Sequence, residues 1–74
     1  MDKYRKAYEG FQDVYERCCV EHDGSKYERT YYEIAKNRLQ GLELVACADN
    51  DITPEEFEEI SSWKIRRITD EAHQ

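Results

Sequence analysis

Apolar residues recur every three or four positions along most of this chain, and no segment shows the alternating pattern of a β-strand. This spacing predicts three helices, at about 2–22, 26–48 and 54–71. Because the two connections between them are only a few residues long, successive helices should run antiparallel. We therefore expect an all-α protein, an up-down-up antiparallel three-helix bundle that forms a single small helical domain over residues 1–74.

The start of the third helix is the clearest local signal in the sequence. Thr53 is a typical N-cap residue, and Pro54 suits the first helical position because its missing N–H is not needed there. Glu56 follows Thr53 by three residues, which is the spacing of a capping box. The third helix should therefore begin at Pro54.

Glycines mark the first connection and the first two helices. Gly24 is expected to end the first helix, while Ser25 and Glu28 have the spacing of a capping box for the second. Folding the second helix back about Gly24 brings Gly10 and Gly41 near one crossing. They either allow the two backbones to approach closely or are merely tolerated, and both interpretations stay open.

Cysteine and histidine suggest one candidate for chemistry. Cys18 and His22 lie four residues apart on one helical face, as a nucleophile and its base or two metal ligands would. In an antiparallel bundle, however, Cys47 lies about 25 Å from Cys18 along the helix axis, too far to complete a metal site or a disulfide. We therefore expect free thiols and no metal, cofactor, catalytic residue or enzymatic activity.

The net charge of −6 is concentrated in one segment. Residues 49–63 contain six acidic and no basic residues, and we call these six the acidic corner: Asp49, Asp51, Glu55, Glu56, Glu58 and Glu59. Acidic residues in a first helical turn complement the helix dipole, which accounts for Glu55 and Glu56. Glu55 and Glu59, four residues apart, form a like-charge pair, so the corner is expected to lack local counterions. The alternative is a solvated helix start that only keeps the protein soluble.

Two aromatic residues are expected near the surface. Tyr32 projects from the flank of the second helix, and Trp63 lies at the edge of the apolar stripe of the third, four residues after Glu59. Arg38 falls inside the apolar sector of the second helix, and we expect it to extend to solvent along its own stem rather than pair with a carboxylate such as Glu9 or Asp13. The predicted partner-binding residues are Asp49, Asp51, Glu55, Glu58, Glu59, Trp63 and Tyr32.

These features favour a small, non-enzymatic acidic binding protein that occupies a basic surface of a partner protein. If that surface normally holds nucleic acid, the carboxylates would replace phosphates, and the protein would be an inhibitor of the phage or mobile-element type, anti-CRISPR-like or anti-repressor-like. Direct nucleic-acid binding is not expected, because the glutamates that begin the third helix would repel phosphate. The alternative is a self-associating structural or adaptor module, a homodimer formed through the tyrosine-rich flanks.

No contact with a membrane is expected either. The chain has no run of 18 apolar residues, and its first residues lack the apolar core of a signal peptide. The sequence therefore predicts a cytoplasmic protein.

Overall fold

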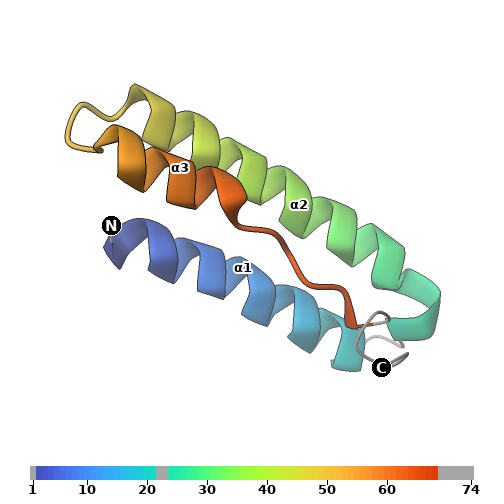
Figure 1. Ribbon diagram of the computed structural model, residues 1–74. Coiled ribbons are helices and arrows are strands. Elements are labelled where there is room, and N and C mark those ends of the chain that lie inside the picture. Colours follow the sequence, from blue (N-terminus) through green and yellow to red (C-terminus); the bar gives the residue numbers. More distant parts are fainter. Residues whose placement is uncertain (1, 22–23, 69–74) are drawn as a thin grey trace.

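Three helices make up the computed structural model, which describes residues 2–21 and 24–68: α1 (Asp2–Glu21), α2 (Gly24–Ala48) and α3 (Pro54–Ser62). No strand occurs among these residues. α1 and α2 lie antiparallel along their lengths, and α3 returns beside α2 (Figure 1). The predicted all-α, up-down-up three-helix bundle is confirmed.

The first connection differs in detail from the prediction. Gly24 and Ser25 belong to α2, which begins two residues before the expected position. The predicted capping role of Glu28 is wrong, because its side chain is buried and its carboxylate accepts hydrogen bonds from Tyr15 and Arg67. Glu28 therefore binds side chains that are distant in the sequence instead of the start of its own helix.

The start of α3 is as predicted. The Thr53 hydroxyl accepts the Glu56 backbone N–H at 3.1 Å, and the Glu56 carboxylate accepts the Thr53 N–H at 3.0 Å. These bonds complete the capping box, and Pro54 occupies the first helical position. The hydrogen bond from the Thr53 N–H lowers the pKa of Glu56.

The end of α3 is not as predicted. The helix ends at Ser62 rather than near residue 71, so it has only nine residues. The Ser62 hydroxyl donates to the Glu59 carbonyl at 2.6 Å, the kind of local bond by which serine competes with helix continuation. Trp63 then adopts an extended conformation, with ψ of 142°. Residues 63–67 continue in a non-helical conformation along α1 and α2 (Figure 1).

Side chains of α1 hold this C-terminal segment, residues 63–68. The buried Gln12 amide donates to the Arg66 carbonyl at 3.0 Å, and its oxygen accepts the Arg66 N–H at 2.9 Å. One turn earlier, the Tyr8 hydroxyl donates to the Lys64 carbonyl at 2.8 Å. These side chains satisfy backbone groups that a longer helix would have paired internally, which favours the extended conformation.

Tyr15 joins the C-terminal segment to both long helices. Its hydroxyl donates to Glu28 on α2 at 2.6 Å and accepts the Ile68 N–H at 2.9 Å. Arg67 donates to both oxygens of the same Glu28 carboxylate, at 2.6 and 3.0 Å. Burial and the Glu28 hydrogen bond raise the pKa of Tyr15, whereas the Arg67 hydrogen bonds lower that of Glu28.

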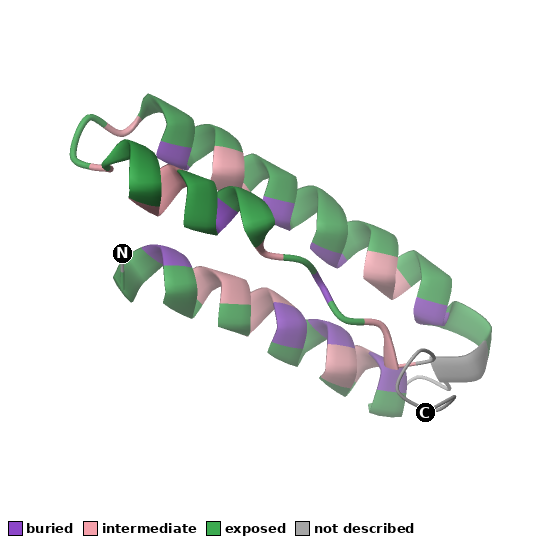
Figure 2. Cartoon of the chain, viewed as in Figure 1, coloured by how far each residue is buried: buried purple, intermediate pink, exposed green. Residues whose placement is uncertain are grey.

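The core runs between the helices and the C-terminal segment (Figure 2). Its buried residues form two clusters: Tyr15, Cys19, Ala35, Leu39 and Ile65 in one, and Tyr4, Ala46 and Ile60 in the other. Ile65 comes from the non-helical segment, so this segment completes the core that a longer α3 was expected to complete.

Gly10 and Gly41 do not mark a close approach of backbones. A Cβ atom built on either glycine meets no other atom within 4 Å. Of the two interpretations, the structure supports the one in which both glycines are merely tolerated inside their helices.

Candidate protein-interaction surfaces

Asp49 has a counterion, contrary to prediction. Its carboxylate accepts the Tyr4 hydroxyl at 2.6 Å and the Asp51 N–H at 2.9 Å, and Lys3 lies 3.4 Å away. The hydrogen bond with Tyr4 is the main cause of the lowered pKa of Asp49, and it raises the pKa of Tyr4 to about 12. Asp49 is therefore engaged in holding the end of α2 to the start of α1.

Glu59 is also paired within the chain. Arg5 Nη2 lies 3.2 Å from its carboxylate, and the Arg5 guanidinium lies 5.6 Å from the centre of the Trp63 ring. Both partners of this ion pair are about half exposed, so its contribution to stability is small. The expectation that the acidic corner lacks local counterions is wrong for Asp49 and Glu59.

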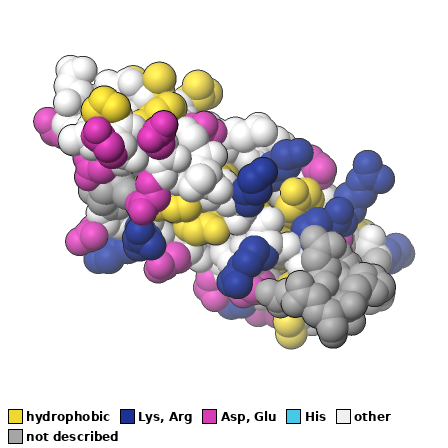
Figure 3. All heavy atoms as spheres, in the orientation of Figure 1, with side chains coloured by type: hydrophobic (Ala, Val, Ile, Leu, Met, Phe, Trp, Pro, Cys, Tyr) yellow, Lys and Arg dark blue, Asp and Glu magenta, His cyan; other side chains and the backbone are white. Residues whose placement is uncertain are grey.

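Four residues of the corner are exposed, and besides the paired Glu59 they are Asp51, Glu55 and Glu58. Within the described part of the chain, none of the three forms an ion pair. On the face shown in Figure 3, Asp and Glu side chains gather over the end where α2 leads into α3, and most of the visible Lys and Arg lie nearer the other end. The ion pairs of Asp49 and Glu59 reduce the excess of negative charge at this end, and the three unpaired carboxylates maintain the rest.

Trp63 and Tyr32 are not the exposed aromatic residues that the sequence predicted. Trp63 is half-buried and stacks on Tyr8, with ring centres 5.0 Å apart. Tyr32 is half-buried with its ring edge-on to Tyr15, and the Arg67 guanidinium lies 4.7 Å from its centre. The reason is the early end of α3, because the C-terminal segment returns over the flanks where these rings lie.

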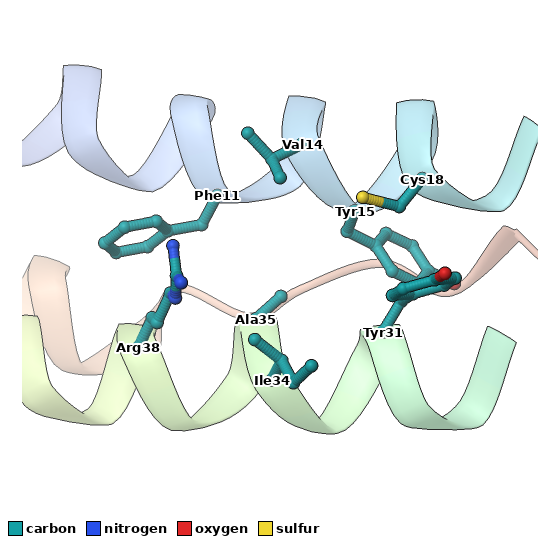
Figure 4. A pocket seen from close by; sticks show the side chains of 8 residues that line it. All are labelled: Phe11, Val14, Tyr15, Cys18, Tyr31, Ile34, Ala35 and Arg38. Atoms are coloured by element: carbon teal, nitrogen blue, oxygen red, sulfur yellow. The ribbon is translucent and has the colours of Figure 1, made fainter. Parts of the chain in front are cut away.

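A groove that the sequence did not predict lies on the open side of the α1–α2 pair. Figure 4 shows side chains of the two helices facing one another across it, with Arg38 reaching towards Phe11. Its volume is about 190 Å³, and its lining is apolar except for Arg38: Phe11, Val14, Tyr15, Cys18, Tyr31, Ile34, Ala35 and Arg38. Arg38 is exposed and forms no ion pair with any described residue, as predicted.

All three cysteines are free thiols: Cys18 is half-buried, Cys19 buried and Cys47 exposed. Burial raises the pKa of the Cys19 thiol, which makes it a poor nucleophile. His22 lies outside the described residues, so its predicted proximity to Cys18 is not defined. Among the residues that are described, no three His, Cys, Asp or Glu side chains are grouped closely enough to hold a metal ion.

Comparison with known proteins adds no relative. Neither a family model, nor a curated protein, nor a solved structure matches this chain. In the described part of the chain, no helix combines the length and the apolar character needed to cross a bilayer. Function must therefore be argued from the chain's own surfaces.

Proposed function

We propose that this chain is a non-enzymatic binding protein whose acidic corner contacts a basic surface on a partner protein. The observation that supports this proposal is the exposure of Asp51, Glu55 and Glu58 without a counterion in the described structure. Two neighbouring carboxylates, those of Asp49 and Glu59, have counterions from α1. The contacting set is therefore smaller than the one predicted from sequence.

The surrounding structure orders the backbone at two of these residues, Glu55 and Asp51. The capping box fixes the first turn of α3, which carries Glu55, and the Asp49 carboxylate fixes the backbone at Asp51. Carboxylates on an ordered backbone lose less conformational freedom when they bind a cationic partner. Because Trp63 is packed against Tyr8, binding would depend mainly on charge and would weaken as salt is added.

The finer form of the proposal concerns the kind of partner. If the basic surface normally binds nucleic acid, the carboxylates replace its phosphates, and the chain competes with that nucleic acid as an inhibitor of the phage or mobile-element type. Such an inhibitor would be displaced by an excess of the nucleic acid that the partner binds.

Affinity capture from the host, with three forms of the chain, tests the proposal. The wild type is compared with the variant Glu55→Gln, Glu58→Gln and with the variant Glu9→Gln, Glu21→Gln, which removes the same charge from exposed positions of α1. A partner bound through the acidic corner should be retained by the wild type and the α1 variant and lost by the α3 variant. Retention of the same proteins by all three forms at every salt concentration would contradict the proposal.

Self-association remains the second candidate function. Tyr32 and Trp63, the residues expected to mediate it, are used in contacts inside the chain. Self-association is favoured instead by an exposed, uncharged face of α2.

A further inference from the structure

One face of α2 is exposed and uncharged along the whole helix. Its residues are spaced alternately by three and four positions, and we call them the outer stripe: Tyr27, Thr30, Ile34, Asn37, Gly41, Leu44 and Ala48. All seven are exposed. The chain is 38% charged, so an exposed face without charge over 25 helical residues requires an explanation.

The spacing of the outer stripe is that of a coiled-coil seam. Alternate steps of three and four residues place Tyr27, Ile34, Gly41 and Ala48 at heptad positions a, and Thr30, Asn37 and Leu44 at positions d. The 25 residues of α2 span about 37 Å, enough for several layers of such a seam. The buried residues of α2, which include Ala35, Leu39 and Ala46, lie on the opposite side of the helix, so a second helix can approach the stripe.

The charges beside the outer stripe indicate what covers it. Glu33 and Arg38 flank it on opposite sides, at heptad positions g and e, and both are exposed. Neither forms an ion pair with any residue that the structure describes. Five residues is the spacing at which a g residue of one helix meets an e residue of a parallel partner. Glu33 of one copy would therefore face Arg38 of a second copy, twice in a symmetric pair.

The side chains of the stripe agree with a parallel pair. A β-branched residue at position a and a leucine at position d favour a parallel two-stranded coiled coil, and the stripe has Ile34 at a and Leu44 at d. In the antiparallel register that stacks Ile34 on the second copy's Leu44, the two Arg38 side chains would instead come together.

We propose that the outer stripe is a self-association surface, on which α2 of a second copy of this chain packs in parallel as a two-stranded coiled coil. The surface is separate from the acidic corner, so the proposal does not depend on the proposed function. In the dimer, both acidic corners lie at the same end of the molecule, where two copies could engage one partner.

Sedimentation equilibrium of the whole chain, from micromolar to millimolar concentration, tests the dimer. The wild type should dimerise within this range, whereas Leu44→Lys should weaken dimerisation by about tenfold or more. The matched control is Val20→Lys, because Val20 on α1 is 84% exposed and Leu44 is 72% exposed. It should leave the dimer unchanged. Circular dichroism should show the same helix content in all forms, because both substituted side chains are exposed.

A charge exchange tests the parallel orientation. In Glu33→Arg alone, or in Arg38→Glu alone, like charges face each other across the seam, and each variant should dimerise about tenfold or more weakly than the wild type. An equimolar mixture of the two should form heterodimers about as stable as the wild-type dimer, because both cross-pairs then carry opposite charges. A wild type that stays monomeric, a dimer that persists in Leu44→Lys, or a mixture no stronger than its components would overturn the proposal.

Discussion

Tyr15 is the residue at which α1, α2 and the C-terminal segment meet. Its buried hydroxyl donates to the carboxylate of Glu28 and accepts the backbone N–H of Ile68. A hydrogen bond to a charged acceptor contributes more to stability than one between neutral groups, and its removal leaves the remaining partners less well satisfied. A single substitution at Tyr15 can therefore remove hydrogen bonds that join α1 to both α2 and the C-terminal segment.

Tyr15→Phe should lower the free energy of unfolding by about 2 kcal/mol, because it removes both hydrogen bonds and keeps the ring. Urea denaturation measures the change. The control is Tyr32→Phe, because the Tyr32 hydroxyl forms no hydrogen bond with described residues, while its half-buried ring packs edge-on against Tyr15. The control should stay within about 0.5 kcal/mol of the wild type. Equal losses in the two variants would show that the Tyr15 hydroxyl does not connect these elements.

The Glu28 carboxylate makes the stability of the fold depend on pH. The Arg67 hydrogen bonds hold its pKa below the ordinary value of 4.5, so the unfolded chain takes up a proton at Glu28 before the folded chain does. Its stabilising contribution is therefore complete above pH 4.5 and is lost as the pH falls through the lower, folded pKa. Glu28→Gln should be less stable than the wild type at neutral pH, and its stability should fall less steeply below pH 4.5. Urea denaturation at a series of pH values would contradict this role if the two proteins showed the same slope.

At the scale of elements, the C-terminal segment shows what local sequence could and could not predict. The start of α3 follows from capping residues, which act over a few positions, and its capping box was predictable for this reason. The end of α3 depends instead on Gln12, which binds Arg66 across 54 residues of sequence. Ile60, Ile65 and Ile68 also suit a helical stripe, so periodicity alone favoured a longer helix.

Gln12→Met should release the centre of the C-terminal segment while preserving the size of the side chain. The Arg66 N–H and carbonyl would lose their Gln12 partner, so the Arg66 amide should exchange with deuterium about tenfold faster. Hydrogen exchange followed by NMR measures this rate. Gln40→Met, the same change at an exposed position of α2, should not alter it. Unchanged protection of Arg66 in Gln12→Met would mean that packing of Ile65, rather than Gln12, holds the segment.

At the scale of the whole molecule, charge was predictable in sequence but its pairing was not. The concentration of acidic residues in 49–63 can be counted directly, whereas Lys3 and Arg5 reach Asp49 and Glu59 only because α1 begins where α2 ends. The antiparallel arrangement of α1 and α2 already places the start of α1 beside the end of α2, so these ion pairs could have been inferred from the predicted topology. The exposure expected of Trp63 and Tyr32 was wrong because it relied on a full-length third helix.

The exposed carboxylates of the acidic corner are proposed to form a binding surface for basic groups. NMR titration of the chain with an arginine-rich peptide measures this most directly, residue by residue. We expect the largest amide shift changes between Asp51 and Glu58, diminished by added salt and absent in the variant Glu55→Gln, Glu58→Gln, while the variant Glu9→Gln, Glu21→Gln behaves as the wild type. Shift changes spread over all acidic residues, or centred on α1, would contradict the claim.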